Sequence, residues 1–122
     1  MRVSHHFEIK IKNTFLQSQR TISLNAHKVL NILLSIHSDE FAFLTTNLVY
    51  LTIDEYLVLH PESGNEYRDL KRVSEGLKKA TIQFQNTDRH INIFESIEYS
   101  TKDRGLYGEL NEEFIRQYNR II

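Results

Sequence analysis

The spacing of hydrophobic and polar positions changes several times along the chain, and each change predicts a new element. Residues Val3 to Lys12 alternate in part, with three apolar residues on one side, which is typical of a β-strand. Ser23 then precedes an apolar run, Leu24 to Leu34, that covers more than half of a helical wheel. We therefore expect a capped and largely buried helix. The segment His37 to Leu51 shows no clean period, so a loop and a short helix both stay open there.

The middle of the chain predicts two further helices separated by a tight turn. Thr52-Ile53-Asp54-Glu55 is a capping-box sequence, and it begins a short helix that reaches about Leu59. Pro61 ends this helix, and Ser63-Gly64-Asn65-Glu66 supplies a turn with a second capping-box pattern. A longer helix, Glu66 to about Ala80, follows. A helix, a short turn and a second helix are the order of a helix-turn-helix motif.

The next part of the chain predicts a β-hairpin. Thr81 to Gln85 alternates and is rich in strand-forming residues, and Asn86 to His90 has the composition of a turn. Ile91 to Ser100 then resumes strand character. We expect these segments to pair, with Arg89 at the tip of the hairpin.

The last part of the chain adds a second turn and a terminal helix. Lys102 to Gly105 has turn composition, Leu106 to Leu110 is compatible with a returning strand, and a helix runs from Glu112 to about Asn119. A helix-turn-helix followed by an antiparallel hairpin predicts a winged helix of the α+β class. We expect one such domain over residues 1–122.

Composition limits what this domain can be. A chain of 122 residues suits a single domain, because two halves would be too small to bury useful cores. No apolar run reaches the roughly 18 residues of a membrane span, and the first residues lack the features of a secretory signal, so we expect a cytoplasmic protein. The absence of cysteine excludes disulfides, thiolate metal sites and cysteine nucleophiles.

The net charge of −1 and the pI near 6.6 restrict any DNA-binding surface to a local patch, since DNA-binding domains often have a pI above about 9. The predicted helix Glu66 to Ala80 supplies such a patch. It holds five basic and three acidic residues, a local balance of +2. At about 100° per residue, its basic side chains fall opposite its apolar ones and extend along about three turns of the helix. This geometry can follow a phosphate backbone or enter a DNA groove. The basic residues are Arg68, Arg72 and Lys79, flanked by Lys71 and Lys78.

A solvated face of an ordinary amphipathic helix explains the same pattern, so the helix alone does not decide the function. The order of elements favours DNA binding, because a short helix and a tight turn precede this helix and a hairpin follows it. Arg89 in the first turn and Lys102 and Arg104 in the second are further candidate phosphate contacts.

Other chemistries have weaker support. His5-His6 are adjacent on a predicted strand and point to opposite faces, which does not suit a metal site. Asp54-Glu55 and Glu112-Glu113 stand at predicted helix starts, where the helix dipole favours negative charge. Tyr56 and Tyr67 have no metal-activated partner and are interpreted as packing residues, and no glycine-rich phosphate loop is present. We therefore expect that the protein is not an enzyme and binds no cofactor.

The central motifs resemble a known family. Ile53-Asp54-Glu55-Tyr56, followed by the segment Glu66 to Ala80, is similar to the central signature of Rep-family plasmid replication initiators. Ser23 to Leu30 resembles the first long helix of that family, and Ile97-Glu98-Tyr99 resembles the strand after its wing. The resemblance extends over about residues 10–118.

The resemblance implies function as well as fold. Rep-family initiators bind repeated origin sequences through tandem winged-helix domains. Their first domain dimerises in the inactive or repressor form, and in the monomeric initiator it contacts mainly the DNA backbone. On this sequence, the resemblance implies phosphate contacts from Arg68, Arg72 and Lys79, with Arg89 on the wing. The second domain, which carries the main base-reading helix, is not part of the matched region.

The expected partners are thus duplex DNA of plasmid origin repeats, a second copy of the chain in a homodimer, and host replication proteins. We expect no binding to a membrane. Two other functions stay open. One is a pure dimerisation or protein-interaction module whose cationic helix face is only solvated. The other, more remote, is a metal-dependent DNA nickase.

Overall fold

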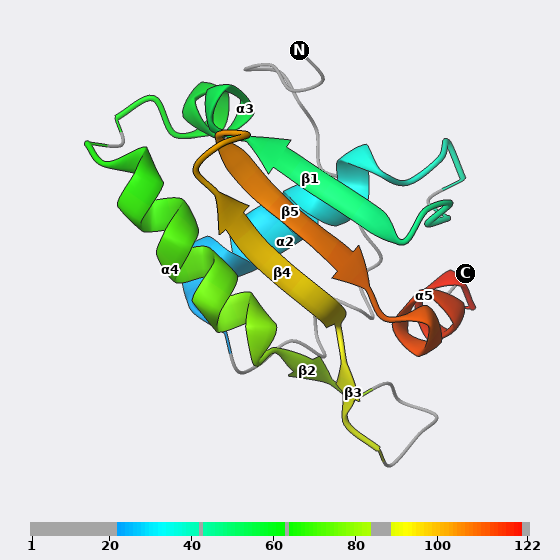
Figure 1. Ribbon diagram of the computed structural model, residues 1–122. Coiled ribbons are helices and arrows are strands. Elements are labelled where there is room, and N and C mark those ends of the chain that lie inside the picture. The colour runs from blue at the N-terminus through cyan, green and yellow to red at the C-terminus, as the bar shows by residue number, and fades with distance from the viewer. Residues whose placement is uncertain (1–21, 42, 63, 84–88, 121–122) are drawn as a thin grey trace.

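A computed structural model describes residues 22–41, 43–62, 64–83 and 89–120. Nine helices and strands lie in these ranges (Figure 1). In chain order they are α2 (Leu24–Ile36), β1 (Leu48–Thr52), α3 (Ile53–Leu59), α4 (Glu66–Lys78), β2 (Thr81–Ile82), β3 (Ile91–Asn92), β4 (Phe94–Ser100), β5 (Gly105–Leu110) and α5 (Glu112–Asn119). The strand expected in Val3 to Lys12, with His5 and His6, lies outside the described residues.

Strands β1, β5 and β4 form an antiparallel sheet in that spatial order. Tyr50 of β1 and Glu98 of β4 both stand opposite Tyr107, so β5 is the central strand. The order α2, β1, α3, α4, β4, β5 is that of a winged helix, and the β4–β5 hairpin occupies the position of the wing. The predicted α+β winged-helix class is therefore confirmed.

The position of the wing differs from the prediction. The expected hairpin forms only between β2 and β3, where Thr81 pairs with Asn92 and Ile82 with Ile91. Its second strand changes partner at Ile93, whose N–H donates to the carbonyl of Ala80 while its carbonyl accepts from the N–H of Asn111. Beyond this residue the chain pairs with β5. The assignment of the Arg89 hairpin as the wing was therefore wrong.

Strand β1 lies in the segment that the sequence left open. Its inward residues Val49 and Leu51 are buried, while its outward residues Leu48 and Tyr50 are exposed. Because apolar side chains occupy both faces, the alternation between apolar and polar residues that marks a half-buried strand is missing. The hydrophobic pattern of the sequence therefore does not predict this strand.

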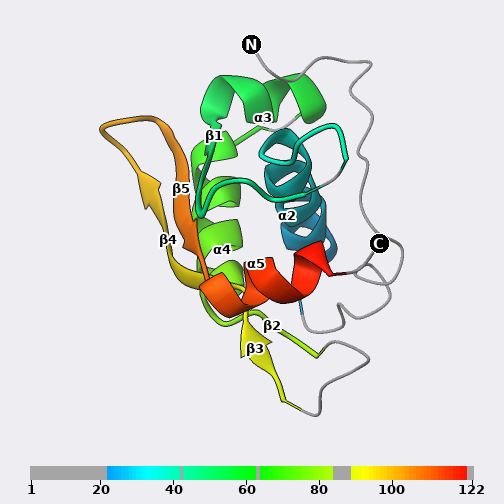
Figure 2. The same ribbon diagram turned by 90° about the vertical axis from the view of Figure 1, so that its right-hand side faces the viewer.

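Helices α2 and α4 pack on the same face of the sheet (Figures 1 and 2). As predicted, α2 is the central helix, and its residues Val29, Leu30, Leu33 and Leu34 are fully buried. The hydroxyl of Ser23 accepts a hydrogen bond from the N–H of Ala26, which confirms the predicted cap. The buried apolar side chains of the described residues form a single cluster that holds the helices and strands together.

The two helices of the helix-turn-helix begin at different kinds of cap. At α3 the predicted capping box is present, because Thr52 Oγ1 accepts from the N–H of Glu55 and Glu55 Oε1 accepts from the N–H of Thr52. At α4 the cap is Asn65, whose side chain accepts from the N–H of Arg68. The second capping box predicted to start at Ser63 is therefore corrected, and Ser63 itself lies outside the described residues.

Candidate nucleic-acid interface

Two parallel rows of side chains run along the exposed part of α4. The first row is Arg68, Arg72 and Lys79, and it lies opposite the buried residues of the helix. The second row is displaced by one residue and repeats the same i, i+4, i+11 spacing. It consists of Tyr67, Lys71 and Lys78.

All of the predicted DNA-binding side chains are exposed to solvent, which leaves them accessible to a ligand. Lys78 and Arg89 form ion pairs with described residues. The other six form none within the described part of the chain, so their charges are not neutralised there. These six are Arg68, Lys71, Arg72, Lys79, Lys102 and Arg104.

The turn of the β4–β5 hairpin, residues 101–104, is held by local hydrogen bonds. The hydroxyl of Ser100 accepts from the N–H of Asp103 and donates to its carboxylate, both at 3.1 Å. Arg104 adopts a left-handed backbone conformation with a φ of 52°. These contacts fix the backbone of the turn, and Lys102 and Arg104 project from it at the tip of the wing.

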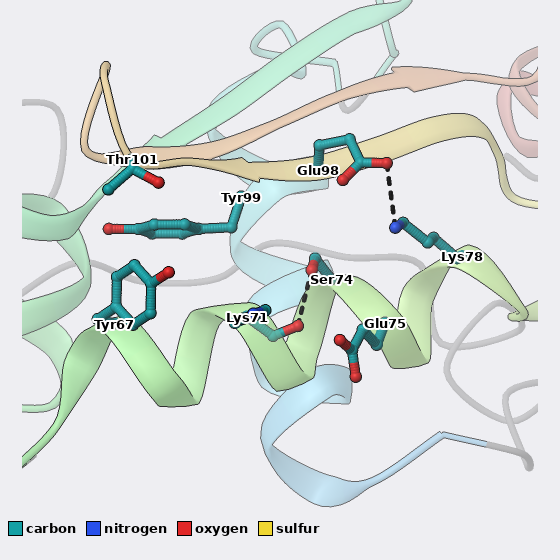
Figure 3. A pocket seen from close by; sticks show the side chains of 8 residues that line it. All are labelled: Tyr67, Lys71, Ser74, Glu75, Lys78, Glu98, Tyr99 and Thr101. Carbon is teal, nitrogen blue, oxygen red and sulfur yellow. Dashed lines mark hydrogen bonds and ion pairs between the residues drawn. The ribbon is translucent and has the colours of Figure 1, made fainter.

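A groove separates α4 from β4 and its turn, and we call it the α4–β4 groove (Figure 3). It has a volume of 220 Å³ and a mainly polar lining. The second row of α4 forms one wall and the end of β4 forms the other. The lining residues are Tyr67, Lys71, Ser74, Glu75, Lys78, Glu98, Tyr99 and Thr101.

Two contacts bridge this groove. The Nζ atom of Lys78 lies 3.0 Å from Oε1 of Glu98, and both side chains are exposed to solvent. The rings of Tyr67 and Tyr99 meet edge to face with their centroids 4.8 Å apart. Burial raises the pKa of the Tyr99 hydroxyl above its usual value of 10, and the nearby Tyr67 adds to this rise while the charge of Arg104 opposes it. The hydroxyl is therefore a neutral hydrogen-bond donor at pH 7.

Arg89 lies apart from this groove. The β2–β3 pair is at the opposite end of β4 from the wing turn (Figure 1). The guanidinium of Arg89 forms an ion pair with the carboxylate of Glu113 at the start of α5. Its charge is thus partly neutralised within the chain, and its role as a phosphate contact stays a prediction.

The residues considered for other chemistries have structural roles. Glu55 is only 3% exposed and closes the capping box of α3, and Glu112 and Glu113 stand in the first turn of α5, as predicted. Tyr56 is buried in the core, which confirms its interpretation as a packing residue. Tyr67, in contrast, is 42% exposed and lines the groove. No group of three or more potential metal ligands occurs among the described residues.

Three residues of this surface were not predicted from the sequence, namely Tyr67 as a surface residue, Tyr99 and Thr101. The repeated i, i+4, i+11 spacing was a usable signal for Tyr67, because it places this residue beside Lys71 and Lys78. No signal in the sequence placed Tyr99 and Thr101 beside α4, since that contact depends on β4 leaving β3.

The outer face of the sheet carries a different kind of surface. No helix of the described residues covers it (Figures 1 and 2). Leu48 is 64% exposed there, and Tyr50 and Tyr107 stack with their ring centroids 5.8 Å apart. This face thus combines exposed apolar and aromatic side chains with Glu109, opposite Leu48, and Glu98, opposite Tyr107, unlike the cationic face of α4.

The family model described as "Initiator Replication protein, WH1" matches residues 8–121. The chain belongs to this family. The match covers nearly the whole sequence and confirms the resemblance to Rep-family replication initiators, together with the winged-helix class. It also supports a role for this WH1 domain in replication initiation. A search of curated protein sequences found no match.

Within the described part of the chain, no helix combines the length and the apolar character needed to cross a bilayer.

Proposed function

We propose that this WH1 domain binds duplex DNA of plasmid origin repeats, mainly through phosphates, and has no enzymatic activity or cofactor of its own. The observation that carries the proposal is the row Arg68, Arg72 and Lys79. These three exposed cations form no ion pair with other described residues and extend along one side of the helix that follows the turn of a helix-turn-helix. Such a row can follow a DNA phosphate backbone.

The wing supports the same proposal. Lys102 and Arg104 lie on a turn whose backbone is fixed, beyond the end of β4 that borders the α4–β4 groove. A cationic helix next to a cationic hairpin turn is the arrangement that winged helices present to DNA. The small net charge of −1 indicates that affinity depends on these few side chains rather than on a basic domain as a whole.

A salt titration tests the proposal. Binding to a labelled duplex is measured by fluorescence anisotropy at several salt concentrations, and we expect log K to fall linearly with log salt. Arg72→Ala should weaken binding and reduce the slope by about 0.9, the value for one phosphate contact. Arg116→Ala is the matched control, because Arg116 is also exposed but lies on α5.

Two results would count against the proposal. One is a wild-type chain that does not bind duplex DNA at low salt. The other is an Arg72→Ala variant whose slope equals that of the wild-type chain. Either result would favour the alternative in which the cationic face of α4 is only solvated.

We further propose that the chain forms a homodimer through the outer face of the sheet. The exposed Leu48 and the stacked pair Tyr50 and Tyr107 support this part of the proposal, since exposed apolar patches commonly mark protein interfaces. Light scattering should give a dimer for the wild-type chain and a monomer for Leu48→Lys. If DNA binding fails while the dimer forms, the chain is an interaction module instead. Contacts with host replication proteins stay a prediction.

A further inference from the structure

The lysines at the two ends of the α4–β4 groove differ in their ion pairing. At the end near the C-terminus of α4, the ammonium group of Lys78 is paired with Glu98. At the end near the wing turn, Lys71 is exposed and forms no ion pair with a described residue. The carboxylate of Glu75 points away from β4 (Figure 3). Lys71 is thus a basic side chain of the wing end whose charge no described residue pairs, although Glu66 lies near enough to Tyr99 to raise the pKa of its hydroxyl.

Three hydroxyl groups share the wing end with Lys71. They belong to Tyr67, Tyr99 and Thr101, which line the groove from both walls (Figure 3). None of these hydroxyls is hydrogen-bonded to another described residue. The edge-to-face contact between Tyr67 and Tyr99 fixes the two rings and so limits where their hydroxyls can lie.

We infer that the wing end of the α4–β4 groove binds one phosphate group of the DNA backbone. Lys71 supplies the charge, and the hydroxyls of Tyr67 and Tyr99, with Thr101, supply the hydrogen bonds. This inference rests on the proposed function and deepens it, because it assigns a specific phosphate seat between the helix and the wing. The tyrosines are thereby DNA contacts as well as packing residues.

The chemistry of the seat suits a phosphate in particular. A phosphate diester offers only acceptor oxygens on its non-bridging positions, and an ammonium group with hydroxyls offers the matching donors. Protein hydroxyl groups commonly bind DNA phosphates in this way. The seat is open to solvent and lies between the two elements of a winged helix that face DNA, so a backbone can pass over it.

Conservative variants separate this seat from the Arg68, Arg72 and Lys79 row. Tyr67→Phe and Tyr99→Phe remove only the hydroxyls and keep the ring contact. We expect each to lower the affinity for duplex DNA about 10- to 100-fold at fixed salt, the loss of one hydrogen bond to a charged group, with an unchanged salt slope. Lys71→Gln should lower the slope by about 0.9.

Two controls keep the result interpretable. Thr45→Val also removes one hydroxyl, but from an exposed residue in the segment between α2 and β1, and should leave DNA affinity unchanged. Thermal unfolding checks that each variant folds. If Arg72→Ala weakens binding while the variants of Tyr67, Tyr99 and Lys71 bind as tightly as the wild-type chain, the seat is refuted and the proposed function stands. If the wild-type chain binds no duplex, both are refuted.

A titration with inorganic phosphate distinguishes a backbone seat from a site for free phosphate. Changes in the backbone amide NMR signals of the protein are recorded as phosphate is added, and a titration with sodium chloride at the same ionic strength is the reference. Weak binding that perturbs Lys71 and Thr101 only at high phosphate concentration, together with the losses in DNA affinity, supports the backbone seat. Tight phosphate binding that leaves DNA affinity unaffected would overturn it.

Discussion

The backbone carbonyl of Arg104 accepts a hydrogen bond from the backbone N–H of Ile53, with an N to O distance of 2.9 Å. Ile53 is the first residue of α3, and its N–H has no partner within the helix. The wing turn therefore satisfies a helix terminus of the helix-turn-helix. This bond ties the two DNA-facing parts of the proposed interface to each other.

A substitution at Gly105, the residue after Arg104, should disrupt the hydrogen bond between Ile53 and Arg104. A Cβ atom added at Gly105 would lie 2.8 Å from the carbonyl oxygen of Leu51 and 3.1 Å from the Cα of Thr52. Both atoms belong to the β1 backbone, which cannot move without disturbing the sheet. We expect Gly105→Ala to destabilise the chain by about 1–3 kcal/mol, measured by urea unfolding.

Gly76 provides the matched control. It lies inside α4 on the exposed side, and a Cβ atom there would meet nothing within 4 Å. Gly76→Ala should therefore stabilise the chain by about 0.5–1 kcal/mol, because alanine loses less backbone entropy in a helix. Equal effects of the two substitutions would contradict the close packing of β5 against β1.

The sequence predicted helices better than strand pairing, and the reason is physical. Caps such as Ser23 and the Thr52 box are local signals that act within four residues. Strand partners depend on distant segments, and nothing local indicates that Ile93 changes partner from Ala80 to Asn111. The wing was consequently assigned to the wrong turn.

The candidate site was predicted only in part for the same reason. Arg68 and Arg72 were found because the helical period places them on one face, and that period is a local property. The opposing wall of the α4–β4 groove comes from β4, so the proximity of Tyr99 to Tyr67 required the correct strand order. Hydroxyl groups also carry no charge pattern that would mark them in a sequence.

The capping box at α3 should contribute measurably to stability. Thr52→Ala removes the hydroxyl that accepts from the N–H of Glu55. We expect a loss of about 1 kcal/mol in the free energy of unfolding, measured with urea, which is typical of such caps. Thr45→Ala is the control, because Thr45 is exposed and lies outside the helices and strands. The expectation fails if both variants unfold at the same urea concentration.

The ion pair between Lys78 and Glu98 should limit DNA binding. Because both side chains are exposed, the pair adds little stability, and Glu98→Gln should change the free energy of unfolding by less than about 1 kcal/mol. The variant also removes a negative charge from the groove and frees Lys78 for a phosphate. We expect tighter binding to duplex DNA and a steeper salt dependence, by up to about 0.9 in slope.

Glu40→Gln controls for the change in net charge alone. Glu40 is exposed and lies in the segment between α2 and β1, which joins the sheet at the edge opposite β4 and α4 (Figure 1). It should therefore leave the salt slope unchanged. A slope that rises equally in Glu40→Gln and Glu98→Gln would show a general charge effect and contradict a specific role for Lys78.

His60 should make stability depend on pH. Its ring stacks on Tyr56, with the centroids 4.7 Å apart. Burial lowers the pKa of His60 below its usual 6.5, and the charge of Lys28 lowers it further, while Glu62 and Asp69 oppose the shift. Since the unfolded chain then binds a proton more readily than the folded chain, this contribution to stability is present above pH 6.5 and is lost as the pH falls below it.

Urea unfolding at a series of pH values below and above 6.5 tests this linkage, with His60→Asn as the variant that cannot titrate. The free energy of unfolding of the wild-type chain should fall more steeply on acidification than that of His60→Asn. Lys28→Gln removes one of the two causes that lower the pKa, so it should give an intermediate slope. Identical slopes for the wild-type chain and His60→Asn would mean that the folded and unfolded chains bind protons at residue 60 equally well, contrary to the burial of the ring against Tyr56.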